Sequence, residues 1–431
     1  MNRHESVGWS KLDNAAKAFP PTVKKSDTRV FRFSCELFEE IDEAVLQRAL
    51  DKAVLDFPHF ICVMRKGIFW YYLERCNIKP VVQPESKMPC AQLYRSGYKT
   101  LLFEVTYFRN RINLEIFHSL ADGLGGLQFF QTIVMKYLTE KYKSDFSDNI
   151  PFLNNNSSVT ERGKDSFFDY YNKDKSIKKI KKEKAYVFRG QKREDDSIIV
   201  IEGRLSVKEV LELAHKYNTT LTAFLTSAFI YSIGKDMTEN NRKLPIVIDI
   251  PVNLRKYFSS QTSRNFFAMI SISYTFNDKN DSFEKIVETV SKAMKNEITK
   301  ERLSQVMKSF SKFEHNPAIR VVPLPIKDLA ISMERHRLDK YSTSVVSNIG
   351  AIDMPEAVQK YISSFSVNSS TLSTQLCICS FKDNLELGFT SAFIETERQK
   401  NFFRTLSEFG LDVEIFCNDF SGNRGDKNVE L

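Results

Sequence analysis

The sequence predicts a two-lobed α/β protein, and three observations support this fold class. Both halves of the chain mix long helical patterns with apolar, strand-like runs. A polar, lysine-rich stretch at 154–184 separates the halves and contains few residues that could form a core. The 431 residues are 42% hydrophobic and include 35 Phe, which is enough for a large core. We therefore expect an N-terminal lobe at 1–165, a basic connector at 166–196 and a C-terminal lobe at 197–431.

The first half is expected to contain two helices and a hairpin. Apolar residues recur at three- and four-residue spacing in 39–57, which predicts a helix that ends before Pro58. Residues 101–108 and 112–117 are apolar runs separated by a polar turn, which predicts a β-hairpin. A second amphipathic helix is expected at 124–142.

The second half is expected to alternate strands with helices. A strand at 197–202 precedes a helix at 206–217, which Ser206 and Glu209 would cap. The strongly apolar stretch 220–233 predicts a helix buried on most sides. The remaining predictions are strands at 244–252, 266–276, 341–348, 362–370, 374–381 and 385–390, and helices at 282–303 and 395–409.

Composition excludes several classes of protein. The segment from Lys173 to Arg193 holds ten basic and two acidic residues, so it accounts for the whole net charge of +8. The rest of the chain is neutral, and no nucleic-acid partner is expected. The start of the chain has no apolar signal, and the apolar run 221–233 is too short for a bilayer, so we expect no membrane span and a cytoplasmic location.

Known site patterns for metals and nucleophiles are missing from the sequence. Seven cysteines include no Cys-x-x-Cys pair, which favours reduced thiols in the cytoplasm. No zinc-binding helix pattern, phosphate loop or Gly-x-Ser-x-Gly elbow occurs, so we expect no metal site.

The sharpest local signal is the segment 116–126, IFHSLADGLGG, where an apolar run delivers His118 just before a glycine-rich helix start. Histidine suits proton transfer near neutral pH because its ordinary pKa is about 6.5. Asp122 follows four residues later and could hold the loop or accept a hydrogen bond. The alternative is a buried histidine held by its own loop.

This motif, His118-x-x-x-Asp122-Gly123, resembles the active-site motif of the acyltransferase superfamily that includes chloramphenicol acetyltransferase, condensation domains of peptide synthetases and alcohol acetyltransferases. Further segments resemble the bacterial alcohol acetyltransferase branch and occur in the expected order, among them WSKLDNAA at 9–16, PVNLR at 251–255, RNFF at 264–267 and SNIG at 347–350. The resemblance covers nearly the whole chain. It implies an α+β two-layer sandwich in each of two lobes, which form a V with a central tunnel.

The resemblance also implies roles for the motif residues. His118 would be the general base that takes a proton from an acceptor hydroxyl as it attacks an acyl-CoA thioester. Asp122 would be structural and would pair with Arg255, because a buried carboxylate needs a partner. Gly123 would permit a backbone conformation or a close approach that a larger residue would block. The alternatives are that Arg255 is a surface residue at the end of a strand and that Gly123 is an ordinary loop glycine.

Two further residues are candidates for contacts to the acyl group. Ser347 and Asn348 could donate hydrogen bonds to the tetrahedral oxyanion or the acyl carbonyl. The alternative is that both residues only turn the strand before Gly350.

These inferences predict an acyl-CoA-dependent O-acyltransferase, most simply one that transfers acetyl to an alcohol or another small hydroxyl acceptor in a direct ternary complex. Acyl-CoA would be a cosubstrate with no permanently bound cofactor, and the chain would act as a monomer. The alternatives are N-acylation, condensation with an acyl carrier protein, and a non-catalytic binding module. Phe117 stands where condensation domains usually carry a second histidine, which argues against that branch. The basic connector is either solvated or attracts the phosphates of CoA or an acidic carrier protein.

Overall fold

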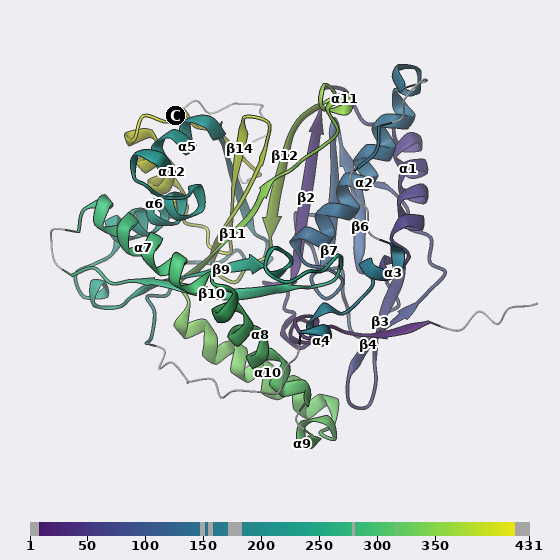
Figure 1. Ribbon diagram of the computed structural model, residues 1–431, viewed down its shortest axis with the longest axis horizontal. Helices are drawn as coiled ribbons and strands as arrows, with labels where there is room; N and C mark the ends of the chain where they lie inside the picture. Colours follow the sequence, from purple (N-terminus) through teal and green to yellow (C-terminus); the bar gives the residue numbers. More distant parts are fainter. Residues whose placement is uncertain are drawn as a thin grey trace, which may run out of the picture.

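Two β-sheets, each covered by its own layer of helices, make up most of the protein (Figure 1). The computed structural model describes residues 8–146, 151–153, 158–170, 183–277, 281–315 and 317–418, without the side chains of 159, 168, 169, 309–315, 317 and 318. The mixed α/β architecture with two lobes confirms the predicted fold class.

The first sheet has five strands, four of them from the N-terminal half. Across the sheet the order is β12 (Ile362–Ser369), β2 (Val30–Leu37), β7 (Arg111–Phe117), β6 (Phe103–Phe108) and β5 (Gln83–Pro84). Neighbouring strands are antiparallel except for the short β5–β6 pair. Helices α1 (Glu43–Asp56) and α2 (Gly123–Lys141) pack together over one face of this sheet (Figure 1).

The second sheet has seven strands, all from the predicted C-terminal lobe at 197–431. Its order is β10 (Phe267–Tyr274), β9 (Ile246–Asn253), β11 (Ser344–Ala351), β13 (Thr374–Phe381), β14 (Asn384–Ser391), β8 (Ile199–Ser206) and β15 (Glu414–Cys417). Its helical layer contains α5 (Val207–Lys216), α6 (Leu221–Asp236), α7 (Phe283–Glu297) and α12 (Glu397–Glu408).

Smaller elements complete the described chain. A three-stranded sheet combines β1 (Trp9–Lys11), β4 (Tyr71–Arg75) and β3 (Cys62–Lys66). The longer helices α8 (Lys300–His315) and α10 (Leu324–Leu338) extend from the second lobe. The short helical segments are η1 (Ala16–Ala18), η2 (Pro20–Thr22), η3 (Pro58–Phe60), η4 (Lys143–Phe146), α3 (Val159–Arg162), α4 (Ser166–Asp169), η5 (Asn241–Lys243), η6 (Leu254–Lys256), α9 (Pro317–Arg320), η7 (Asp339–Tyr341) and α11 (Glu356–Gln359).

Most predicted elements are present with small changes at their ends. The 39–57 helix begins later, because the side chain of Asp42 caps it by accepting a hydrogen bond from Val45 N. Ser206 caps α5 as predicted, and α6 is buried along most of its length. The predicted 282–303 helix is wrong in its length, because α7 ends at Glu297 and α8 starts at Lys300. The strand β2, the β3–β4 hairpin and α10 were not predicted.

One strand crosses between the lobes. β12 comes from the predicted C-terminal lobe but pairs with β2 in the first sheet. A polar row joins it to the second sheet: Asn368 Nδ2 donates to Glu202 at 2.7 Å, and Arg204 donates to Ser364 at 2.9 Å. The first sheet therefore contains a strand from the C-terminal part of the chain, so the lobes are not simply two consecutive pieces of sequence. The predicted boundaries at 165 and 197 stay predictions.

Other predictions concern the connector, the cysteines and metals. Residues 171–182, which hold Lys173, Lys175, Lys178, Lys179, Lys181 and Lys182, lie outside the described residues. None of the seven cysteines, all of which lie in the described ranges, forms a disulfide. Within the described ranges, no helix has the length and apolarity to cross a bilayer, and no three His, Cys, Asp or Glu side chains are grouped for a metal ion.

Candidate active site

His118 lies directly after β7, at the edge of the first sheet. Its backbone N donates to the carbonyl oxygen of Arg29 at 2.8 Å, which extends the β2–β7 ladder by one residue. The imidazole stacks on Phe19 with ring centroids 4.5 Å apart and meets the edge of Phe31 at 4.9 Å. Phe267, from the second sheet, lies 5.9 Å from the ring. His118 is therefore partly accessible, between aromatic rings of both lobes.

The amide of Asn265 determines which nitrogen of His118 carries the proton. Its Nδ2 donates to the carbonyl oxygen of His118 at 3.0 Å, and a carbonyl can only accept. The amide oxygen Oδ1 must then face His118 Nδ1, which lies 3.3 Å away. Because an amide oxygen accepts, Nδ1 carries the hydrogen, and Nε2 keeps its lone pair.

The surroundings of His118 favour the neutral imidazole. Burial lowers the pKa of His118 from its ordinary value, while the negative charge of Asp122 and the hydrogen bond to Asn265 raise it. Burial dominates, so the ring is unprotonated near neutral pH and can accept a proton.

The buried carboxylate of Asp13 accepts a hydrogen bond from Asn265. Asp13 is fully buried, and its Oδ2 accepts from Asn265 Nδ2 at 3.3 Å, while Oδ1 accepts from Ala16 N at 2.7 Å. Burial raises the pKa of Asp13 to about 6, against the charge of Arg264, which lowers it. The N-terminal segment that carries Asp13 and Phe19 therefore forms one wall of the site.

Asp122 points away from the imidazole and into a buried network. Its Oδ1 accepts from Gly125 N at 2.9 Å, which caps α2, and its Oδ2 accepts from Phe266 N at 2.8 Å. Arg255 completes the network with two bonds, NH1 to Oδ2 at 2.8 Å and NH2 to Oδ1 at 3.2 Å. The pairing expected from the sequence is thus present in bidentate form, with both side chains buried.

Arg255 also holds the segment that follows it. Its guanidinium donates to the carbonyl oxygens of Thr262 at 2.8 Å and Arg264 at 2.5 Å. Through these bonds, Asp122 and Arg255 together fix the segment that delivers Asn265 to His118.

Helix α2 approaches the backbone of Ser263 most closely at Gly125. The sequence predicts a close approach at Gly123 instead. A Cβ on Gly125 would lie 1.8 Å from the backbone oxygen of Ser263. A Cβ on Gly123 would meet only the end of the Ile349 side chain, at 2.7 Å. α2 therefore packs against the 262–266 segment at a distance that only glycine allows.

Ser347 and Asn348 lie on β11, where the strand bulges before Gly350. The Asn348 amide donates to Thr222 Oγ1 and accepts from Gly350 N, both at 2.8 Å. This matches the alternative in which Asn348 shapes the turn. The Ser347 hydroxyl makes no hydrogen bond to any described residue.

Sequence reasoning missed three parts of this site: Asn265, Asp13 and Phe19. All three lie in or beside segments that carried the family resemblance, 9–16 and 264–267, but nothing in those segments indicates a contact with His118. The contact between His118 and Asn265 spans 147 residues, and only the folded chain brings the two together.

Comparison with known proteins decides the family. The sequence profile of the family described as "Alcohol acetyltransferase" matches residues 171–400, more than half of the chain. The chain belongs to the alcohol acetyltransferase family. It is accordingly an acyltransferase. The matched range includes Arg255, Asn265 and Ser347 but not His118.

Several solved structures share the fold of this chain. Polyketide synthase associated protein 5 from Mycobacterium tuberculosis is 12% identical, with a TM-score of 0.60 over 94% of this chain and 98% of that one. F. graminearum TRI101 complexed with coenzyme A and T-2 mycotoxin is 9% identical, with a TM-score of 0.63 over 94% and 99%. The first condensation domain of the calcium-dependent antibiotic synthetase is 14% identical, with a TM-score of 0.58 over 93% and 96%. No curated protein matches the sequence.

Alanine substitutions at Gly125 and at Gly123 should differ in their effect on stability. Gly125→Ala should lower the free energy of unfolding by about 3 kcal/mol or prevent folding, because the backbone of Ser263 must move. Gly123→Ala should change it by less than about 1 kcal/mol, because the end of the Ile349 side chain can rotate. Denaturant unfolding of both variants measures this, and equal losses would contradict the assignment of the close approach to Gly125.

The variant Asp122→Asn should remove the ion pair with Arg255 and keep the cap of α2. Asparagine caps helices about as well as aspartate, but it leaves the buried Arg255 charge unpaired. We expect a loss of about 3 kcal/mol in the free energy of unfolding together with a loss of activity. Adding Arg255→Met removes the unpaired charge, so the double variant should lose less than the sum of the single variants. Strictly additive losses would show that the two side chains are not coupled.

Proposed function

We propose that this enzyme transfers an acyl group, most simply acetyl, from acyl-CoA to the hydroxyl of an alcohol, with His118 as the general base. One observation carries the proposal: in a member of the alcohol acetyltransferase family, a neutral histidine at the junction of the lobes has Nδ1 tied to Asn265 and Nε2 left as the basic nitrogen.

The proposed reaction is a single direct transfer. His118 Nε2 takes the proton from the acceptor hydroxyl as its oxygen attacks the thioester carbonyl. The tetrahedral intermediate collapses by breaking the carbon–sulfur bond, and the imidazolium gives its proton to the departing thiolate. The products are the ester and free CoA, and His118 returns to its neutral form.

The surrounding residues would support this step. The Ser347 hydroxyl is the better candidate to donate to the oxyanion, because Asn348 already uses its amide in the β11 bulge. Asp122, Arg255 and the glycines at the start of α2 would hold the His118 loop against the second lobe without touching substrate.

The state of the cysteines fits a mechanism without an acyl-enzyme. Burial raises the pKa of Cys62 and of Cys377 to about 12, and it also raises the pKa values of Cys35, Cys90 and Cys379 well above the ordinary value. These thiols stay protonated and are poor nucleophiles.

The donor assignment rests on family membership, and the fold likeness to TRI101, whose structure is described as complexed with coenzyme A, agrees with it. Two lobes in one chain can supply every residue of the proposed site, so we propose that the enzyme acts as a monomer. We also propose a cytoplasmic location, which agrees with seven cysteines that form no disulfide.

His118→Ala should lower kcat for thiol release from acetyl-CoA by at least about a hundredfold, because general-base catalysis contributes that much or more. The variant should still fold, since His118 carries no ion pair in the described structure. Thiol release across a panel of alcohols, with a thermal melt, measures both effects.

The matched control for this test is His215→Ala, which removes an exposed histidine from α5 and should leave turnover unchanged. Full turnover in a folded His118→Ala variant would overturn the general-base assignment.

The pH profile tests the role of Asn265. Because burial lowers the pKa of His118, the acid limb of kcat/KM should lie below pH 6.5 in the wild-type enzyme. The hydrogen bond from Nδ1 to Asn265 stabilises the imidazolium, so Asn265→Ala should move this limb to still lower pH. It should also lower kcat about tenfold or more, because the tautomer is no longer fixed.

Asn384→Ala provides the comparison, since it removes a similar amide bond, from Nδ2 to the carbonyl oxygen of Ser363 at 3.1 Å, elsewhere in the fold. Its pH profile should match that of the wild type. If Asn265 were purely structural, Asn265→Ala would lower activity without moving the limb.

A further inference from the structure

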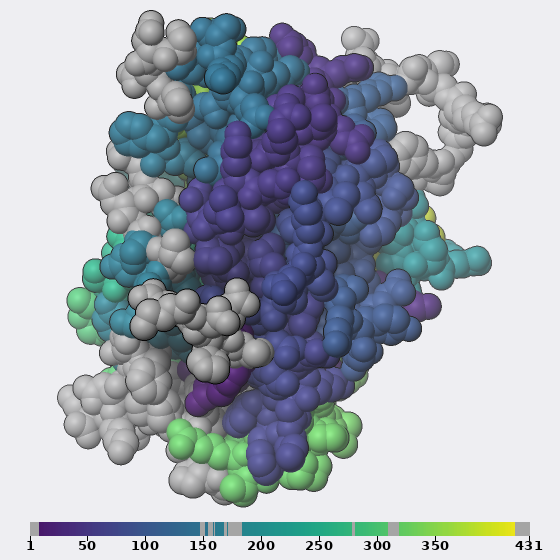
Figure 2. Space-filling model, turned by 90° about the vertical axis from the view of Figure 1, so that its right-hand side faces the viewer, coloured from purple at the N-terminus to yellow at the C-terminus, as the bar shows by residue number. Residues whose placement is uncertain are grey.

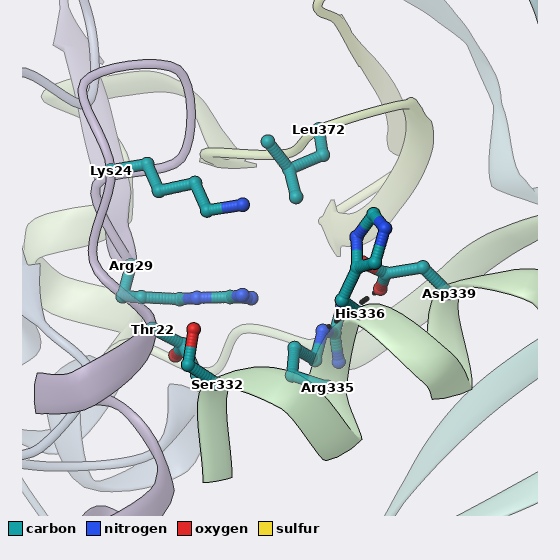
Figure 3. Close-up of a pocket in the computed structure, with 8 residues that line it drawn as sticks. All are labelled: Thr22, Lys24, Arg29, Ser332, Arg335, His336, Asp339 and Leu372. Atoms are coloured by element: carbon teal, nitrogen blue, oxygen red, sulfur yellow. Dashed lines mark ion pairs between the residues drawn. The ribbon is translucent and has the colours of Figure 1, made fainter. Parts of the chain in front are cut away.

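A small pocket, partly open to solvent, lies between the start of β2 and helix α10 (Figure 3). Four basic side chains line it: Lys24, Arg29, Arg335 and His336. Asp339 is the one acidic residue among the lining residues. In Figure 3, Lys24 and Arg29 reach into the space from one side, while Arg335 and His336 stand on the helical side opposite.

Helix α10, which forms one wall, is anchored to the N-terminal half. The Lys327 Nζ lies 3.5 Å from the centroid of the Trp70 ring, and Tyr71 OH donates to Asp328 at 2.7 Å. Figure 2 shows the contact from outside, with green α10 residues along the lower edge of the purple and blue N-terminal face. The wall is therefore built in advance and needs no ligand to form.

The charge in the pocket is positive after its ion pairs are taken into account. Arg335 pairs with Asp339 at 3.0 Å, and Arg29 pairs with Asp27 at 2.9 Å. Lys24 and His336 form no ion pair with a described residue. Lys192, from the basic connector, adds a further positive charge nearby, since its Nζ donates to the carbonyl oxygen of Leu372 on the rim at 3.2 Å.

Arg29 has the features of a binding group. Its φ of 58° lies in the left-handed region, which a non-glycine residue adopts at a cost and which concentrates at functional sites. Its side chain is only 12% exposed, yet its buried Nε has no hydrogen-bond partner among the described residues. A buried guanidinium donor without an acceptor is costly, and an anion in the pocket would satisfy it.

The position of Arg29 indicates which substrate would carry the anion. Its carbonyl oxygen accepts from His118 N at 2.8 Å, so the pocket begins beside the proposed base. The antiparallel register of β2 and β7 pairs Val30 with Phe117, so Arg29 and His118 lie opposite each other one position further along the ladder. In acyl-CoA, the pantetheine arm separates the thioester from the phosphates by roughly 15 Å, the reach of four to five extended residues. An anion this close to His118 therefore belongs to the acceptor.

We propose that this pocket binds a carboxylate or phosphate group of the acceptor, so that the enzyme acylates an anionic hydroxyl compound. The inference rests on the proposed acyl transfer at His118 and adds the class of its acceptor. Arg29 holds the anion at the floor of the pocket, and Lys24 and Arg335 contribute from its rim.

The first experiment needs no turnover. Inorganic phosphate is titrated into the wild-type enzyme and into the variants Arg29→Met, Lys24→Met and Arg335→Met by calorimetry. The dissociation constant should rise at least about tenfold in Arg29→Met and less in the two rim variants. Arg337→Met is the matched control, because Arg337 lies on the same helix, pairs with Glu334 and does not line the pocket.

The second experiment identifies the source of the anion. Thiol release is measured with pairs of hydroxyl compounds that differ only in a carboxylate or its neutral amide, and with acetyl-CoA or acetyl-pantetheine as donor. The wild-type enzyme should prefer the carboxylates, and Lys24→Met or Arg29→Met should reduce that preference at least about tenfold without changing the KM for acetyl-CoA.

Three results would count against these proposals. Phosphate binding that is equal in the wild type and all the pocket variants would overturn the anion site. A rise in KM for acetyl-CoA but not for acetyl-pantetheine would assign the pocket to the donor phosphates and overturn the acceptor assignment. No thiol release with any hydroxyl compound would count against the proposed function itself, while the phosphate titration would still decide the anion site.

Discussion

The carboxylate of Asp122 is the group on which the arrangement of the site depends. Its two oxygens accept from the start of α2, from Phe266 N and from both ends of the Arg255 guanidinium. One buried side chain thus caps a helix of the first lobe and holds a strand and a loop of the second. Because a buried charge without its partner is strongly destabilising, the two lobes are locked together at this point.

The contacts of Asp122 and Arg255 also act on His118, through the segment that carries Asn265. Arg255 fixes the carbonyl oxygens of Thr262 and Arg264, and the segment between β9 and β10 then delivers Asn265 to the imidazole. Gly125 lets α2 approach Ser263 closely enough for this contact. The imidazole of His118 is therefore positioned by residues of both lobes: the first supplies the ring and its aromatic neighbours Phe19 and Phe31, and the second supplies the Asn265 amide that selects the tautomer.

Sequence patterns predicted the elements that have strong local signals. The α6 helix and the β6–β7 hairpin are where periodicity and turn residues place them. β2 was missed because its buried face includes Arg32 and Ser34, whose polar side chains bond to Glu115 and Asn113 of β7. α10 was missed because its exposed apolar residues give no clear amphipathic stripe, and its position depends on contacts with Trp70 and Tyr71.

By itself, the sequence determined the family and the motif His118-x-x-x-Asp122-Gly123, because these follow from residues in recognisable local order. The resemblance to the family also implied the pairing of Asp122 with Arg255, which the structure shows. The tertiary structure alone decided that Asn265 sets the tautomer of His118, that Gly125 makes the closest approach, and that Arg29 faces α10 across a basic pocket. Each of these contacts joins segments far apart in the chain. Hydrophobic burial and buried polar pairing bring such segments together, and neither leaves a mark in the local spacing of residues.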